Sequence, residues 1–259
     1  MVTIVIPVSR PDFLKRVFTQ LELLDCNRED TNILCYIDGD MRLFEVARNL
    51  TEKSKFAKRL AVYRNRGVAN VSSFKRRRIR IAEIHNELKK YIYSAKYLFL
   101  IEDDTIVRTD ALKKMLDLYS VYPHAGFISG VQLGRWGFTT AGIWKVKNNP
   151  YDIQSIESVM PGQGVEEIDA AGLYCCLTKF DVYKKFDFKP YDDILGPDVA
   201  YGIWLRQQGY KNYVDWSITT RHLTKQGEIT LSNTKVQQIK FVKQGENWDQ
   251  TIYDTINTI

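Results

Sequence analysis

Short apolar runs alternate with helical patterns in the first half of the chain, and this alternation restricts the fold more than any other feature. Runs rich in β-branched residues predict strands at 3–8, 32–38, 59–65 and 96–103. Between them, residues 11–24 and 70–95 have the periodicity of helices. The last strand is apolar on both faces, as a central parallel strand must be. We therefore expect an α/β fold with a mainly parallel sheet and helices on both of its faces.

Three acids, Glu102, Asp103 and Asp104, stand at the carboxyl end of the last of these predicted strands. Ligands of open parallel sheets bind beyond the carboxyl ends of the strands, so the acids are expected at the ligand-binding edge. Adjacent carboxylates repel one another and lose hydration, and a cation or a set of donors must compensate them. The oxygen ligands favour Mg²⁺ or Mn²⁺. The alternative is that the acids only begin a loop or cap a helix at 110–119.

Two further carboxylates stand at places that a nucleotide-binding sheet uses. Asp38 ends the second predicted strand, where it is placed to accept hydrogen bonds from a base or ribose, or to form a turn with Gly39. Asp198 precedes a helix that Gly209 would terminate. Such an acid is either an N-cap or a general base that faces the cleft.

The basic residues are concentrated in one region. Between Lys53 and Arg80 there are eleven Lys and Arg and no acid, whereas the rest of the 259 residues carry 26 bases and 31 acids. This asymmetry indicates either a polyanionic partner, such as nucleic acid, a phosphorylated substrate or anionic lipid, or a solvated face.

The remaining composition is that of an ordinary globular protein. The start, MVTIVIPVSRP, lacks the pattern of a signal peptide, and no apolar run approaches about 18 residues. We expect a cytoplasmic protein with no membrane span and no obligate protein partner. The four cysteines form no C-x-x-C pair, which favours reduced thiols.

Five segments in order resemble the glycosyltransferases of the GT-A fold, family 2 above all: TIVIPVSRP, YIDGD, YRNRGVAN, YLFLIEDD and DILGPDVAYGIWLRQQGYKNYVDWSITTRHL. The resemblance covers residues 2–224. It implies one catalytic domain over 1–225, in which a Rossmann-like nucleotide-sugar half at 1–107 is fused to an acceptor and catalytic-base half at 108–225. Residues 226–259 would form a C-terminal extension.

The same resemblance implies roles for individual residues. Donor-binding residues would be Pro7, Val8, Ser9, Arg10, Asp38, Arg66, Arg78, Arg80, Glu102 and Asp103. Asp104, with His222 as a further ligand, would coordinate Mn²⁺ or Mg²⁺ on the donor diphosphate, and Asp198 would be the catalytic base. Three features depart from the family pattern. Glu102 replaces the first Asp of the Asp-x-Asp motif, and Pro197 replaces a Glu. The Ala-Arg-Asn element that precedes the Asp-x-Asp strand has no clear counterpart, and the candidates for the residue that faces the diphosphate are Arg78, Arg80, His85 and Asn86.

The implied reaction is metal-dependent transfer of a hexose, glucose from UDP-glucose, with inversion; retaining enzymes share the fold. The basic region and the aromatic segment GRWGFTTAGIW favour DNA as acceptor, as in bacteriophage glucosyltransferases that act on 5-hydroxymethylpyrimidines. Lys75, Arg76 and Arg77 would hold phosphates, while Trp136 and Phe138 would stack on a base or pack in the core. The alternatives are a saccharide, lipid-linked or protein acceptor, or a non-catalytic nucleic-acid-binding protein.

Overall fold

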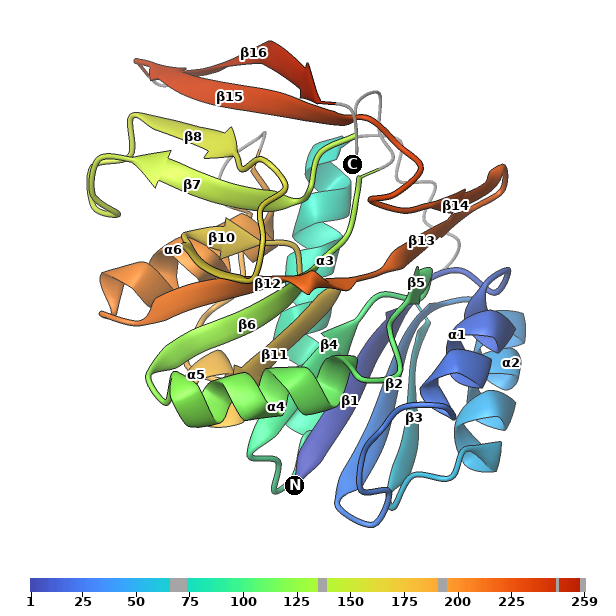
Figure 1. Cartoon of the computed structure of the whole chain (residues 1–259). Coiled ribbons are helices and arrows are strands. Elements are labelled where there is room, and N and C mark those ends of the chain that lie inside the picture. The colour runs from blue at the N-terminus through green and yellow to red at the C-terminus, as the bar shows by residue number, and fades with distance from the viewer. Residues whose placement is uncertain (66–73, 135–138, 191–194, 246, 257–259) are drawn as a thin grey trace.

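The computed structural model describes residues 1–65, 74–134, 139–190, 195–245 and 247–256. Within these ranges, the main sheet has eight strands in the order β3-β2-β1-β4-β11-β6-β12-β9 (Figure 1). Their bounds are β1 Val2–Val8, β2 Thr31–Gly39, β3 Arg59–Asn65, β4 Tyr97–Ile101, β6 Ala125–Val131, β9 Val165–Ile168, β11 Cys175–Lys179 and β12 Lys211–Thr219. The predicted α/β class with a mainly parallel central sheet is confirmed.

The strands of the N-terminal half run parallel and end at one edge. In the paired strands, Ile4 lies opposite Ile33 of β2 and opposite Phe99 of β4, and β3 continues the ladder beyond β2. All three side chains are buried because helices cover the sheet. The segments that follow β1, β2 and β4 therefore meet at the carboxyl edge, where ligands of such sheets bind.

Helices cover both faces of this sheet, and strand alternation assigns each side chain to one of them. Helices α1 (Leu14–Leu21), α2 (Met41–Lys53) and α4 (Ala111–Val121) pack on one face, with Ile4 and Ile6 of β1. Helices α3 (Phe74–Leu88), α5 (Phe180–Tyr183) and α6 (Pro197–Gln207) pack on the other, with Val5. The described residues thus form one extended core on each face of the sheet, and a smaller third cluster joins α6 to the neighbouring sheet.

Two smaller sheets lie beside the main one. The first has the order β10-β7-β8-β15-β16, and the second has the order β14-β13-β5. Their bounds are β5 Thr105–Ile106, β7 Ile143–Lys147, β8 Ser155–Ser158, β10 Ala170–Ala171, β13 Arg221–Thr224, β14 Gly227–Ile229, β15 Val236–Gln244 and β16 Asn247–Ile256. Residues after 225 thus extend sheets that begin earlier in the chain. In the described part of the chain, no helix is long and apolar enough to cross a bilayer.

Helix α6 is held against β10 by contact between the two backbones. A Cβ on Gly202 would stand 2.6 Å from the carbonyl oxygen of Asp169 and 2.7 Å from the Cα of Ala170. The Nδ2 of Asn212, on β12, donates to the carbonyls of Asp169 (2.8 Å) and Gly202 (2.9 Å). These contacts fix α6, and with it the first turn that carries Asp198.

Candidate active site

Asp103 fastens the end of β1 to the end of β4. The backbone amides of Ser9 and Arg10 donate to its Oδ2 at 2.6 and 2.8 Å, and the Ser9 hydroxyl donates at 3.2 Å. The side chain of Asp103 is only 1% exposed. β1 and β4 are neighbouring parallel strands, so this carboxylate ties the loop after β1 to the end of β4 at the carboxyl edge of the sheet. Asp103 therefore supports the loop that is predicted to line the donor pocket.

Arg10 supplies a cation to two of the strand-end acids. Its Nε donates to Asp103 Oδ1 at 2.9 Å, its Nη2 also contacts Asp103, and its Nη1 lies 2.6 Å from Asp104 Oδ2. The pKa of Arg10 is raised: burial lowers it, but the charges of Asp103 and Asp104 outweigh burial. Arg10 thus supplies part of the positive charge that the adjacent carboxylates need.

Asp104 and His222 are brought together by the β5–β13 ladder, in which His222 pairs with Thr105. The amide of Leu223 also donates to the Asp104 carbonyl at 2.8 Å. The Nε2 of His222 lies 3.1 Å from Asp104 Oδ2, and its Nδ1 lies 2.7 Å from the carbonyl oxygen of Leu133. Because a carbonyl only accepts, Nδ1 carries a proton. In the neutral ring, Nε2 then carries a lone pair, which faces the carboxylate of Asp104.

A divalent cation fits this pair. Histidine ligands of metals commonly donate their second nitrogen to a carbonyl, as His222 does to Leu133. Within the described residues, no cluster of three or more His, Cys, Asp or Glu is arranged to hold a metal. Two protein ligands match the sites of Mg²⁺ and Mn²⁺ enzymes in which substrate phosphates and water complete the coordination shell. The donor set therefore fits a cation that is held jointly by protein and substrate.

Glu102 lies at the same edge. Its amide donates to the carbonyl of Tyr174 at 3.4 Å. Burial, and then repulsion from Asp104, raise the pKa of Glu102 to about 7. Of the three neighbouring acids, Asp103 and Asp104 are thus paired to Arg10, whereas Glu102 is the acid whose pKa is raised.

Asp38 is held by α3 at the end of β2. The Nε of Arg80 contacts Asp38 Oδ2, and its Nη2 donates to the Asp38 carbonyl at 3.2 Å. The following turn is completed by another acid, because Asp40 accepts from the Leu43 amide at 2.8 Å and caps α2. Asp38 and Arg80, both predicted donor-binding residues, are therefore paired at the carboxyl edge of the sheet.

Asp198 lies inside the first turn of α6, and the N-cap is Gly196. The N-cap interpretation of Asp198 was therefore wrong. Burial raises the pKa of the Asp198 carboxyl, while the amides of Val199 and Asp198 and the charge of Arg78 oppose that rise. Tyr174, whose backbone carbonyl accepts from the Glu102 amide, has a buried phenol whose pKa is raised, mainly by burial and to a smaller extent by nearby groups that include Asp198.

The basic region divides between two edges of the sheet. Lys53, Lys55 and Lys58 precede β3 and lie at its amino end, whereas Lys75, Arg76 and Arg77 are exposed at the start of α3. The latter three precede Arg78, whose charge acts on Asp198, and Arg80, which contacts Asp38. Only the second group adjoins the predicted site. Arg66, Trp136 and Phe138 lie outside the described residues.

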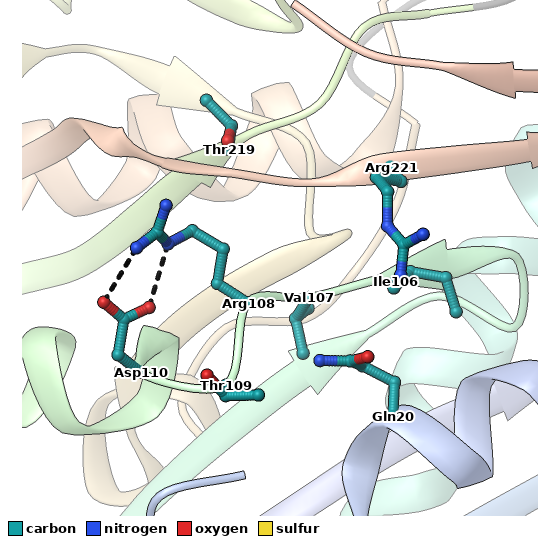
Figure 2. A pocket seen from close by; sticks show the side chains of 8 residues that line it. All are labelled: Gln20, Ile106, Val107, Arg108, Thr109, Asp110, Thr219 and Arg221. Atoms are coloured by element: carbon teal, nitrogen blue, oxygen red, sulfur yellow. Dashed lines mark hydrogen bonds and ion pairs between the residues drawn. The ribbon is translucent and has the colours of Figure 1, made fainter. Parts of the chain in front are cut away.

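A cavity of about 350 Å³, which the sequence did not predict, is lined by residues of β5, β13 and the segment between β5 and α4, among others (Figure 2). It is lined by Gln20, Ile106, Val107, Arg108, Thr109, Asp110, Thr219 and Arg221. Arg221 adjoins His222 on β13, and neighbouring residues of a strand point to opposite faces. Arg108 forms a bidentate ion pair with Asp110, with distances of 2.9 and 3.0 Å. The cavity therefore lies apart from the predicted metal ligands.

No protein-family model and no curated protein sequence matches the chain. Solved structures do. S. aureus TarS 1-349 in complex with UDP-GlcNAc has a TM-score of 0.53 at 9% identity, over 82% of this chain and 54% of that one. The mannosyltransferase PcManGT from Pyrobaculum calidifontis, in complex with GDP-Man and Mn²⁺, has a TM-score of 0.52 at 11% identity, over 83% and 53%.

The chain thus spans about half the length of these structures. At such low identity the likeness concerns the fold alone, and it agrees with the GT-A fold that the sequence motifs predict.

Proposed function

We propose, from a fold that matches GT-A glycosyltransferases, that the protein transfers a sugar from a nucleotide-sugar donor to an acceptor hydroxyl. The observation that carries the proposal is the Asp104–His222 pair, which stands beyond β4 at the carboxyl edge of the sheet. A TarS complex with UDP-GlcNAc and a PcManGT complex with GDP-Man and Mn²⁺ support a nucleotide-sugar donor and a divalent metal.

The donor would lie along the edge formed by the ends of β1, β2 and β4. Asp38, held by Arg80, would accept from the base, and the loop at Ser9 would line the nucleotide pocket. We propose UDP-glucose as the donor. Glu102 would contact the sugar or ribose, and Asp104 with His222 would hold Mn²⁺ or Mg²⁺. When bound, the metal supplies positive charge to the leaving diphosphate.

Asp198 would act as the general base. Its carboxylate takes the proton of the acceptor hydroxyl while that oxygen attacks the anomeric carbon. The bond from this carbon to the diphosphate oxygen breaks, and the nucleoside diphosphate leaves with the electron pair. Attack opposite the leaving group inverts the anomeric configuration. The raised pKa of Asp198 makes it a better proton acceptor than an exposed Asp, which suits this role.

For the acceptor we propose DNA that carries 5-hydroxymethylpyrimidines. The exposed Lys75, Arg76 and Arg77 stand at the start of α3, on the helix that also carries Arg78 beside Asp198. Phosphates held there would bring one base toward the catalytic carboxylate. Saccharide, lipid-linked and protein acceptors are the competing outcomes of the test.

The test is a transfer assay. The protein is incubated with Mn²⁺, a panel of UDP- and GDP-sugars and hydroxymethylated DNA. The DNA is then digested to nucleosides, and their masses are measured by mass spectrometry. A hexose added to the modified base supports the whole proposal. Donor turnover without DNA product moves the acceptor to another class. No turnover of any nucleotide sugar, with any acceptor tried, contradicts the function.

A further inference from the structure

Arg10 contacts the same carboxylate oxygen of Asp104 that faces His222. Asp104 Oδ2 lies 2.6 Å from Arg10 Nη1 and 3.1 Å from His222 Nε2. A divalent cation placed between Asp104 and His222 would stand within a few ångströms of the guanidinium, and like charges at that distance repel strongly in a buried site. Asp104 itself is fully buried, so water does little to screen them.

The rest of Arg10 is fastened independently of Asp104. Its amide donates to Asp103 Oδ2 and its Nε to Asp103 Oδ1, so the loop stays in place if the Nη1 contact is lost. The side chain is 30% exposed, whereas Asp103 and Asp104 are buried. Among Arg10, Asp103 and Asp104, Arg10 is therefore the one side chain that solvent, and hence an entering donor, can reach.

We propose that Arg10 is an internal counter-ion that competes with the divalent metal for Asp104 and is released when a diphosphate offers it another partner. This inference rests on the proposed function, because the diphosphate is that of the nucleotide sugar. Guanidinium groups bind phosphate oxygens well, and the new ion pair would replace the one with Asp104. Metal and nucleotide would then bind cooperatively through a single side chain.

The loss of apparent metal affinity depends on the fraction of molecules in which Arg10 contacts Asp104. If Arg10 covers Asp104 in about nine tenths of the molecules or more, the apparent affinity for the metal alone is weakened about tenfold or more. A diphosphate that withdraws Arg10 removes this penalty. The metal should therefore bind weakly to the protein alone and more tightly in the presence of UDP.

The test is calorimetric titration of Mn²⁺ into the wild type, Arg10→Ala and Arg10→Gln, without nucleotide and with saturating UDP. Without nucleotide, both variants should bind Mn²⁺ about tenfold more tightly than the wild type. With UDP the difference should shrink. Arg10→Gln keeps a donor for Asp103 and serves if the Ala variant does not fold by circular dichroism. Arg16→Ala is the matched control, because Arg16 pairs with Glu228 outside the site and should leave Mn²⁺ binding unchanged.

Equal or weaker Mn²⁺ binding in the folded Arg10 variants would overturn the inference, whatever the enzyme does. Tighter binding that disappears in the Arg10→Ala, Asp104→Asn double variant would place the metal at Asp104 and support it. If metal binding behaves as expected but no nucleotide sugar is turned over, the proposed function fails while the competition at Asp104 stands.

Discussion

The carboxylate of Asp198 lies so close to Gly196 that a Cβ at residue 196 would stand 2.4 Å from Asp198 Oδ1. Gly196 is the N-cap of α6, with φ −78° and ψ 175°, values that any residue adopts. The absence of a side chain at Gly196, rather than an unusual backbone, thus leaves room for the predicted base.

Gly196→Ala should therefore displace the Asp198 carboxylate without straining the helix. We expect sugar transfer to fall about tenfold or more, since misplacing a catalytic group by about 1 Å is costly. Donor affinity should be unchanged, because the predicted donor residues lie on other elements. Steady-state kinetics together with donor titration check this; a variant with normal transfer would show that the position of Asp198 does not matter.

Asp198→Asn should lose transfer about 10²-fold or more while keeping or gaining stability. Burial raises the pKa of Asp198 above its ordinary 3.8, so the folded protein ionises this group less readily than the unfolded chain does. At pH values above 3.8 the unfolded chain ionises this carboxyl at a lower free-energy cost than the folded protein does, so the charged carboxylate lowers stability. Asn carries no charge and removes this cost. Thermal unfolding at pH 7 is the measurement. If Asp198 only stabilised the fold, Asp198→Asn would show near-normal turnover and a lower midpoint of thermal unfolding.

The sheet could be predicted because continuous apolar, β-branched runs form strands that are buried on both faces, as in Val2–Val8. These runs did not predict that Arg10 neutralises Asp104, since that contact depends on a side-chain conformation between loops far apart in the sequence. The run of basic residues likewise did not reveal that its two parts lie at opposite edges of the sheet. Between Lys58 and Lys75 the chain runs along β3 from the amino edge to the carboxyl edge.

The division of the basic region gives a charge-matched test of the acceptor. Lys75, Arg76 and Arg77 all changed to Gln should flatten the salt dependence of DNA binding, because each neutralised phosphate contributes a log–log slope of about −0.9 on duplex DNA. The acceptor KM should rise. Lys53, Lys55 and Lys58 changed to Gln remove the same charge from the opposite edge and should have little effect. Equal effects of the two triple variants would indicate only a general charge attraction.

His85 predicts how stability depends on pH. Burial, and then the charge of Lys89, lower the pKa of His85 to about 3 from 6.5, and its Nδ1 lies 2.6 Å from the Tyr183 hydroxyl. Below pH 6.5 the unfolded chain binds a proton that the folded protein does not. Stability should therefore fall between about pH 6.5 and 3, with a slope of up to about 1.4 kcal/mol per pH unit from this group.

Denaturant titrations at several pH values measure that slope. His85→Gln should reduce it, and His124→Gln, at an exposed position, should not. An unchanged slope in His85→Gln would mean that other groups account for the pH dependence.

Donor binding tests the central claim most directly, because it requires the strand-end site and no knowledge of the acceptor. UDP- and GDP-sugars are titrated calorimetrically, with Mn²⁺ present, into the wild type, Asp104→Asn and the control Asp117→Asn, whose side chain is exposed on α4. The proposed function predicts that UDP-glucose binds the wild type and the control alike and binds Asp104→Asn at least about tenfold more weakly, a difference of about 1.4 kcal/mol. A wild-type protein that binds none of these nucleotide sugars, or an Asp104→Asn variant that binds UDP-glucose as tightly as the wild type, would contradict it.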